Sequence, residues 1–550
     1  MSASGMSAKR CAVGAHVSRR RWLQRAGAGV LGLTLALSLT RSISGAWAAE
    51  RREAGAPLGI AGARHLLART GFGGRPADVA AYAKLTRLAA VERLLADTPT
   101  SPLRAPPAAA LDYFSPQRLK EMREEDRKAF QQERFRVGAE LRAWWLQEMV
   151  EAEAPRALVE RLTLFWHNHF VSSDQKVHAH ALMARQNLLL RENALGNFAD
   201  LLHAVGKDPA MLVYLDGAQN RRENPNENFA REVMELFTLG RGHYQETDIR
   251  EAARAFTGWS LEPDSGAFRW RPAFHDTGSK TVLGRSGNFD GDQVLDILLA
   301  QPACADFIAA KLWQEFVAPP RDDPAEAREI QRLAEVLRRS GYDLRQTLRA
   351  LLLSEPFWAP RNRGVLVKSP VDLVVGTVRS LDVTVPDALP LAFIVRNLGQ
   401  DLFAPPNVRG WPGGEAWINS STLLARKAFI ERLLRGEDYV EPLRRFDGQD
   451  ARFDEATPLM KRRTAQLREA FGQVGGRMDG EARFRLVAAW SAIRVDSRRL
   501  LTRFPERAQL EAALLALPPV NAAAAGTMAG DGPGLALIRT LALDPAYQLT

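Results

Sequence analysis

The sequence predicts an all-α protein, a multi-helix body of about 20 helices with one small β-hairpin near residues 266–284. Three observations lead to this fold class. Nearly every segment after residue 58 repeats its apolar residues at the three- and four-residue spacing of an amphipathic helix. Many of these segments begin at capping residues or prolines. At 550 residues, 46% of them hydrophobic and 25% charged, the chain has a globular composition and exceeds the size of a single core.

The first 48 residues have the pattern of an export signal. The charged stretch "SRRRWLQ" (18–24) precedes an apolar run of about 14 residues, and Ala46 and Ala48 form a small-residue cleavage site. The pair Arg19-Arg20 is typical of a twin-arginine signal. The apolar run is too short to span a bilayer comfortably. We therefore expect export by the twin-arginine machinery, cleavage near Ala48, no stable membrane span afterwards and a periplasmic or secreted protein. A retained membrane anchor is the alternative.

The distribution of charge argues against nucleic acid as a partner. The net charge is +10, but residues 1–48 carry seven basic residues and no acidic one, which leaves about +3 on the rest of the chain. Cysteine usage is equally restrictive. Cys11 lies in the signal, so the mature chain keeps only Cys304 and cannot form an intrachain disulfide.

The first helices of the body are marked by their caps. Pro76 occupies a first-turn position, and Ser115 with Pro116 opens a long helix whose charges recur at three- and four-residue spacings. The helix that starts at Pro155 should end near His169, where the apolar "LTLFWHNHF" gives way to "VSSDQ", which is rich in capping residues.

The second half of the body alternates helices with two irregular regions. Asn226 caps the helix "NENFAREVMELFTLGRG", and Asp248 stands three residues before a glutamate in a capping-box arrangement. Residues 266–284 have the aromatic alternation and glycines of a hairpin. Helices resume at 291 and continue to about 435, interrupted by a Pro/Gly-rich loop at 404–417.

These segments predict four parts of the chain. They are a twin-arginine signal peptide at 1–48, a short linker at 49–57, a main helical domain with a polar centre at 58–435, and a C-terminal helical segment at 436–550 packed on the main domain.

Five longer motifs are similar to those of one bacterial family. They are "FWHNHF", "NENFAREVMELFTLGRGHYQETDIREAARAFTGW", "FHDTGSKTVLG", "LGQDLFAPPNVRGWPGG" and "DPAYQ". Together they resemble the large family catalogued as a domain of unknown function, number 1800, over roughly residues 58–548. The resemblance implies an exported and predominantly helical protein. It implies no reaction, because the family resembles no enzyme class with established chemistry.

Two His-x-His pairs, His167/His169 and His178/His180, form the first candidate site. Residues i and i+2 of a helix point about 200° apart, so one helix cannot direct both members of a pair at one ion. If the helix ends nearby, His167 or His169 with His178 and a carboxylate becomes a candidate ligand set for a divalent metal. The alternative is that His169 packs beside Trp166 with one nitrogen hydrogen-bonded.

A helical stretch with regularly spaced charges forms the second candidate site. Glu227, Arg231 and Glu235 follow one another at four-residue steps, and Asn228 and Glu232 form the neighbouring stripe. In a buried setting this would be a carboxylate–guanidinium ladder beside a polar cleft, and carboxylates in clefts are candidate acids or bases. The alternative is an exposed, salt-bridged helix face.

The turn "FHDTGSKT" forms the third candidate site. It presents His275, Asp276 and Lys280 together, which are residue types that carry general acid–base chemistry. The alternative is a hairpin tip in which Asp276 and Gly278 are turn formers.

The loop "PPNVRGWPGGEAW" forms the fourth candidate site. Trp411 and Trp417 could stack on sugar rings or other flat ligands, with Asn407 beside them as a polar contact. The alternative is a structural plug whose indole rings are buried in the helical body.

The sequence contains no motif of the common hydrolase, nucleotide-binding or zinc-peptidase classes. We expect an exported hydrolase-like enzyme acting on a small-molecule or polymer ligand of the envelope or extracellular space. Its polar centre would consist of His167, His169, Glu227, Arg231, Glu232, His275 and Asp276, with a divalent metal as the candidate cofactor. Substrate contacts would come from Asn228, Lys280, Asn407 and Trp411. The alternative is a non-catalytic binding or assembly protein of the cell envelope. Convergence of the motifs on one pocket would favour catalysis, and separation would favour binding.

Overall fold

The computed structural model describes residues 55–96, 99–435, 480–521 and 533–550. The chain divides into two units, Met1–Ala56 and Pro57–Thr550, and the fold below is that of the second unit. The predicted signal peptide and most of the predicted linker lie outside the described residues, as do parts of the predicted C-terminal segment.

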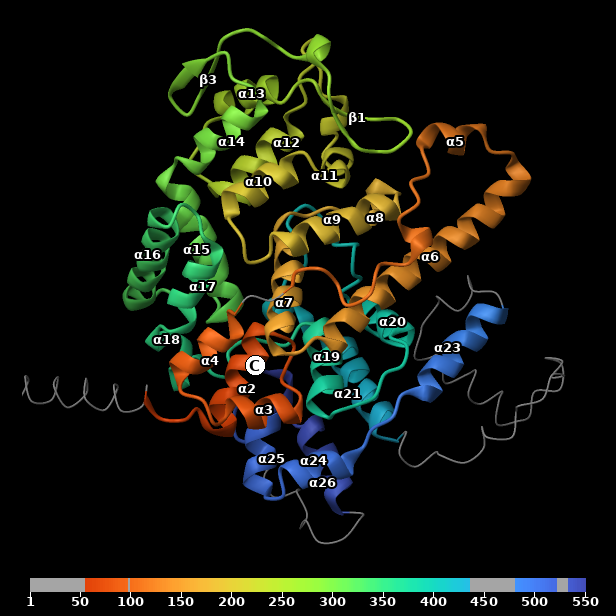
Figure 1. The fold of residues 1–550 in the computed structure, drawn as a ribbon, viewed down its shortest axis with the longest axis vertical. Helices are drawn as coiled ribbons and strands as arrows, with labels where there is room; N and C mark the ends of the chain where they lie inside the picture. The colour runs from red at the N-terminus through yellow and green to blue at the C-terminus, as the bar shows by residue number, and fades with distance from the viewer. Residues whose placement is uncertain (1–54, 97–98, 436–479, 522–532) are drawn as a thin grey trace, which may run out of the picture. The chain divides into compact units, whose positions relative to one another are not determined.

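The described part of the chain is mostly α-helical, as predicted, with 24 α-helices and two small sheets (Figure 1). The first helices are α2 (Gly59–Thr70), α3 (Pro76–Tyr82), α4 (Arg87–Leu94), α5 (Pro116–Glu121), α6 (Glu124–Glu151), α7 (Ala154–His169), α8 (Asp174–Val177), α9 (His180–Glu192), α10 (Phe198–Gly206) and α11 (Pro209–Tyr214). The predicted end of α7 at His169 is confirmed.

The remaining helices lie between residues 227 and 543. They are α12 (Glu227–Glu232), the π-helix η4 (Val233–Thr238), α13 (Glu246–Ala255), α14 (Gly291–Leu299), α15 (Pro302–Phe316), α16 (Pro324–Arg339), α17 (Leu344–Leu352), α18 (Glu355–Trp358), α19 (Pro370–Ser380), α20 (Leu389–Asn397), α21 (Ser420–Arg435), α23 (Gly480–Ala492), α24 (Ser497–Arg503), α25 (Arg507–Leu514) and α26 (Pro533–Leu543).

The extended region forms two two-stranded antiparallel sheets where one hairpin was expected. β1 (Trp259–Leu261) pairs with β2 (Phe268–Trp270), and β3 (Lys280–Val282) pairs with β4 (Arg285–Gly287). The two are separated because Pro272 opens a short 3₁₀ turn and has no N–H with which to continue a ladder.

Helices from distant parts of the sequence meet around α2. This helix packs against α3, α7, α15 and α25, so the first described helix neighbours a helix close to the C-terminal end (Figure 1). The end of the chain is held by main-chain hydrogen bonds of 2.8 Å from Thr550 N to Leu366 O and from Lys368 N to Gln548 O. One continuous cluster of buried apolar side chains runs through the described helices.

Buried arginines bind the free carbonyl oxygens at the helix ends. Arg69 donates to Val317 O at the end of α15 (2.8 Å). Arg379 donates to Ala152 O beyond the end of α6 (2.6 Å) and to Gly73 O after α2 (2.8 Å). The last carbonyls of a helix have no partner within it, so each such hydrogen bond satisfies a buried acceptor and joins two helices.

No single helix among the described residues is long and apolar enough to cross a membrane. Within the described part of the chain, only α14 and α15 taken together have the required length and apolar composition, and the chain bends by 73° between them.

Asp208, which caps α11, should make the stability of the fold depend on pH. It is 2% exposed, and burial raises its pKa to about 7. Because the folded-state pKa lies above the unfolded one, the native state keeps a proton that the unfolded state loses. The resulting stability is fully present below about pH 4 and is lost as the pH rises to about 7.

Asp208→Asn should remove this dependence. Both Met211 N and Gln186 Nε2 donate to the single oxygen Oδ2 of Asp208, each at 2.8 Å, so an amide oxygen can replace it. Between about pH 5 and pH 7.5, the free energy of unfolding of the variant in denaturant should fall by about 1–3 kcal/mol less than that of the wild type. Equal changes in the two proteins would contradict this assignment.

Candidate functional site

The polar helix α12 continues without a break into the π-helix η4. Asn226 caps α12 as predicted, because its side chain accepts from Asn228 N at 2.9 Å. Phe229, Val233 and Phe237 are buried and hold one side of this stretch in the core. π-Turns are rare and occur frequently at functional sites, because the wider turn changes the direction of the residues that follow.

Two carboxylates on the other side of this stretch have opposite electrostatic environments. Glu232 is half-buried and has no hydrogen bond or ion pair within the described residues; burial and the charge of Glu235 raise its pKa. Glu235 accepts from Arg241 Nε at 2.7 Å and from Tyr244 Oη at 2.9 Å, and the Arg241 hydrogen bond lowers its pKa. Neighbouring carboxylates whose pKa values are pushed apart are the usual arrangement of an acid and a base.

The loop at 404–417 is anchored to the end of α7 and comes close to these carboxylates. Trp411 N donates to Asn168 Oδ1 at 2.8 Å, and Gly410, at φ +81°, leaves no room for a Cβ beside Asn168. The charge of Arg409 lowers the pKa of both Glu232 and Glu235. The motifs "FWHNHF", "NENFARE" and "NVRGW" therefore converge on one surface.

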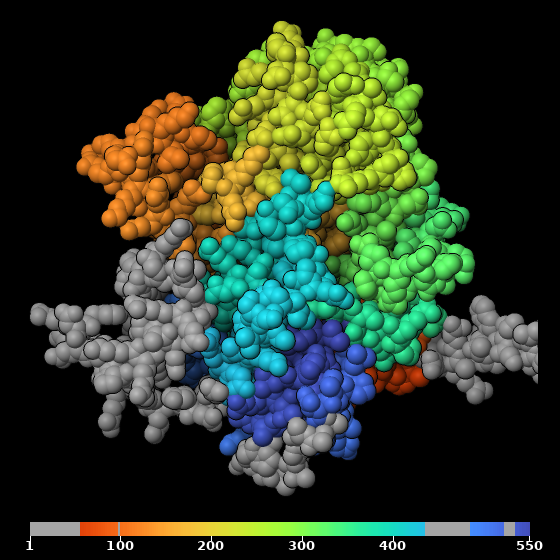
Figure 2. Space-filling view, turned by 180° about the vertical axis from the view of Figure 1, so that it is seen from behind, coloured from red at the N-terminus to blue at the C-terminus, as the bar shows by residue number. Residues whose placement is uncertain are grey.

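Figure 2 shows this arrangement from behind: the cyan surface of residues near 400–420 borders the yellow surface of residues near 210–240, with a recess beside the border. Arg409 is exposed, and its guanidinium has no hydrogen bond or ion pair in the described part of the chain. The predicted ligand contact Asn407 instead shapes the loop, because its Oδ1 accepts from Arg409 N at 2.9 Å. Trp411 is 5% exposed, so it is largely the buried plug of the alternative prediction.

A second polar group borders the carboxylates. Asp216 Oδ2 accepts from Lys176 Nζ at 2.9 Å and from Asn228 Nδ2 at 3.1 Å. The sequence did not single out Asp216, Lys176 or Arg409, because only the folded chain brings them to α12. Asp216 has a left-handed backbone (φ 59°), as does Phe403 immediately before the loop (φ 63°). Strained residues of this kind cluster at functional sites.

The first histidine pair is structural. His169 Nε2 donates to Phe237 O at 3.0 Å among aromatic rings, and His167 packs against the rings of Trp145, Phe403 and Trp411. Burial lowers the pKa of each to about 3, so both are neutral at physiological pH. His169 therefore contacts the π-helix through a main-chain carbonyl and not through a carboxylate.

The second histidine pair, His178 and His180, contacts Arg134 of α6. His178 is exposed, and its Nδ1 accepts from Arg134 Nη2 at 3.0 Å. His180 Nδ1 lies 3.0 Å from Asp174 Oδ1, and its Nε2 donates to Arg134 O at 2.8 Å. Among the described residues no group of three or more His, Cys, Asp or Glu is arranged to hold a metal ion. The predicted metal set of His167, His169 and His178 is thus not brought together.

The "FHDTGSKT" turn is held by hydrogen bonds within itself, to α13 and to the residues that follow α13. Asp276 forms a two-pronged ion pair with Arg254 (2.7 and 3.0 Å) near the end of α13. Lys280 is 1% exposed and donates to Asp276 O at 2.6 Å, while His275 Nδ1 donates to Thr257 O at 2.9 Å. These contacts match the hairpin-tip alternative, and among the described residues no hydrogen bond or ion pair links the side chains of His275, Asp276 or Lys280 to α12 or η4.

The ion pairs of Arg231 differ from those of the predicted ladder. It binds Glu227 at 3.1 Å and Glu246 of α13 at 2.8 Å, and its side chain is 35% exposed. Glu235 is not its partner, because the π-turn carries that residue off the α-helical stripe.

Comparison with known proteins gives one family. The family model described as "Protein of unknown function (DUF1800)" matches residues 65–549. No curated protein and no solved structure matches the chain.

Arg231→Ala should have a small effect on stability. Because the side chain is partly exposed and its two ion pairs are accessible to water, the free energy of unfolding in denaturant should fall by less than about 1 kcal/mol. Arg339→Ala, at an 81% exposed ion pair on α16, is the matched control. A loss of about 3–5 kcal/mol at Arg231 would instead indicate a buried charge network.

Proposed function

This chain belongs to the family of proteins of unknown function numbered 1800, and from that premise we propose that it is an exported hydrolase-like enzyme with Glu232 as its general acid. The substrate would be a polymer or small molecule of the envelope or extracellular space. The observation that carries this proposal is the unpaired, half-buried Glu232 beside the paired, ionised Glu235.

The proposed chemistry needs one proton donor and one ionised carboxylate. Burial favours the protonated form of Glu232, which can give its proton to a leaving oxygen as the bond to it breaks. Glu235 stays ionised because Arg241 and Tyr244 donate to it, so it can orient a water or stabilise positive charge in the transition state. The exposed Arg409 would hold an anionic or polar group of the substrate next to them.

A non-catalytic binding protein is the second candidate function. The satisfied network of Lys176, Asp216 and Asn228 favours it, because a pre-ordered polar surface can bind a ligand without reacting with it. The two candidates differ in what Glu232 does, so the same variant separates them.

Export remains part of the proposal and rests on the residues before the described part. The basic residues of the first 48, the short apolar run and the small-residue site support a cleaved twin-arginine signal.

Glu232→Gln should abolish hydrolysis while leaving the protein folded. With chromogenic glycosides, esters and phosphoesters, the wild type should turn over at least one member, and the variant should be slower by about 100-fold or more, the usual contribution of a general acid. The wild-type rate should fall as the pH rises through the raised pKa of Glu232, because the acid is then lost.

Glu227→Gln, which changes a paired glutamate on the same helix, is the control and should keep its activity. Equal rates for Glu232→Gln and wild type would reject the catalytic role, and ligand binding without turnover would support the second candidate.

Replacing both Arg19 and Arg20 by lysine should leave the precursor in the cytoplasm, because the twin-arginine pair is what the export machinery recognises. Immunoblots of cell fractions measure this outcome. Normal appearance of the double variant outside the inner membrane would exclude this route.

A further inference from the structure

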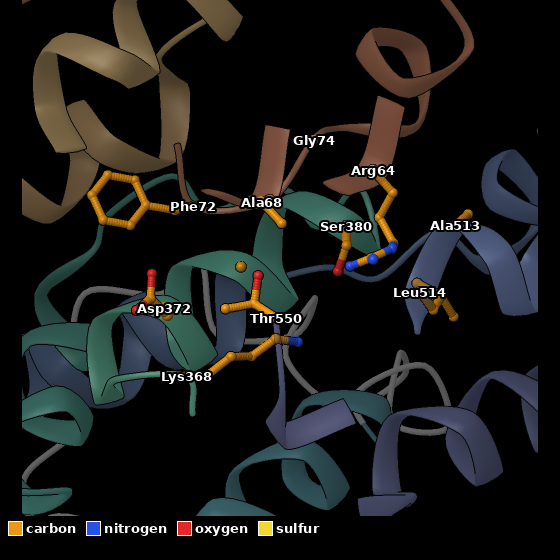
Figure 3. A pocket seen from close by; sticks show the side chains of 12 residues that line it. Arg64, Ala68, Phe72, Gly74, Lys368, Asp372, Ser380, Ala513, Leu514 and Thr550 are labelled. Carbon is orange, nitrogen blue, oxygen red and sulfur yellow. The ribbon is translucent and has the colours of Figure 1, made fainter. Parts of the chain in front are cut away.

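A small cavity lies where the first and last parts of the described chain meet, away from the residues of the α12 surface. It has a volume of about 30 Å³, enough for about two water-sized spheres, and its walls come from α2, α19, the end of α25 and residue 550. Its polar lining consists of Arg64, Lys368, Asp372, Ser380 and Thr550. Figure 3 shows Arg64 and Lys368 extending towards this space from opposite sides, with Thr550 beside it.

Arg64 is a buried cation without a hydrogen-bond partner. The residue is 7% exposed, its Nε atom is buried and unbonded, and its guanidinium forms no ion pair with any described residue. Burial and the neighbouring charge of Arg363 lower its pKa to about 10. An unsatisfied buried guanidinium is costly, so its position at a cavity wall calls for a partner inside the cavity.

Lys368, on the opposite wall, is a second cation without a hydrogen-bond partner among the described residues. Its Nζ lies 3.7 Å from the centroid of the Tyr547 ring and has no hydrogen bond to the described residues. Burial, together with the charges of Arg64 and Arg426, lowers its pKa to about 7, although Asp372 acts in the opposite direction. A cation–π contact satisfies part of the charge but provides no acceptor for the ammonium protons.

The acid in the lining does not balance these charges. Asp372 is already ion-paired with Arg161 and accepts from Ser369 Oγ at 2.8 Å. Arg69, which lies behind the wall, donates to the neutral main-chain carbonyls of Val317 and Asn362. It also donates to the main-chain oxygen of Thr550 at 2.8 Å, so a carboxylate at residue 550 is paired with Arg69 and not with Arg64 or Lys368. The cavity therefore keeps a surplus of positive charge.

We propose that this cavity is a binding site for one small oxyanion, either free phosphate or the phosphate end group of a larger molecule. Arg64 would bind it through its fork of N–H groups and Lys368 would bind it as a point charge. The bound anion would hold Lys368 protonated. Above about pH 7 this proton must be taken up on binding, whereas phosphate gains its second negative charge over the same pH range, so the two effects oppose each other.

The test uses the full chain and measures thermal unfolding against inorganic phosphate, with sodium chloride at equal ionic strength as the reference. A ligand that binds only the folded state raises the midpoint, and the rise continues with the logarithm of ligand concentration above Kd. We expect phosphate to raise the midpoint more than chloride does when both are measured at pH 6, where Lys368 carries its charge. Comparison with phenyl phosphate distinguishes the two sources: tighter binding of free phosphate assigns a closed inorganic site, and tighter binding of phenyl phosphate assigns an end-group site.

Two variants tie the effect to the cavity. Lys368→Met should weaken phosphate binding by at least about tenfold, because it removes one of the two charges. The same change should raise stability without phosphate, because it removes a cation whose charged form is disfavoured by desolvation. Arg64→Gln should weaken binding similarly, while Arg339→Gln, at a surface ion pair, should leave it unchanged. A phosphate effect no larger than that of chloride, or one retained by Lys368→Met, would overturn the proposal and leave the surplus charge to be balanced within the chain.

Discussion

The fold depends on arginine side chains that bind the free carbonyl oxygens of helix ends. Arg69 closes the end of α15, Arg379 closes the end of α6, and Arg161 donates to Gly71 O after α2 at 2.9 Å. A multi-helix body has many such ends, and a buried carbonyl without a donor would cost more than a hydrogen bond usually contributes. Because each guanidinium reaches a residue far away in the sequence, these caps also fix which helices are neighbours, and thereby hold α7 with Asn168 at its end.

The candidate site follows from that placement. Asn168 holds the loop at Gly410 and Trp411, and the loop places Arg409 near Glu232 at the end of α12 and Glu235 of η4. The π-turn then separates two glutamates that an α-helix would treat alike. Glu235 meets Arg241 and Tyr244 and stays ionised, whereas Glu232 stays unpaired and is the easier of the two to protonate. This difference, and not a histidine or metal centre, is the basis for an acid–base function.

The sequence predicted what depends on local patterns. The helical class, the cap at Asn226 and the end of α7 at His169 all follow from spacing and capping residues. Asp248 does belong to a capping box, but its partner is Gln245 and not the glutamate three residues later. The predicted pair of Glu227 and Arg231 is present, as on the exposed face of the alternative prediction. The step from Arg231 to Glu235 was wrong because a π-turn has no simple sequence signal and because Glu246 comes from another helix. The cavity at Arg64 and Lys368 was missed for the same reason, since the two residues are far apart in the chain.

The central claim, that Glu232 and Glu235 have opposite pKa shifts, can be measured directly. Carbon-13 NMR of side-chain carboxyl groups in selectively labelled protein, with the two signals assigned from Glu232→Gln and Glu235→Gln, would follow each titration. The account predicts that Glu232 titrates above the ordinary value for glutamate and that Glu235 titrates below it. Coincident titrations of the two groups, or the reverse order, would contradict it.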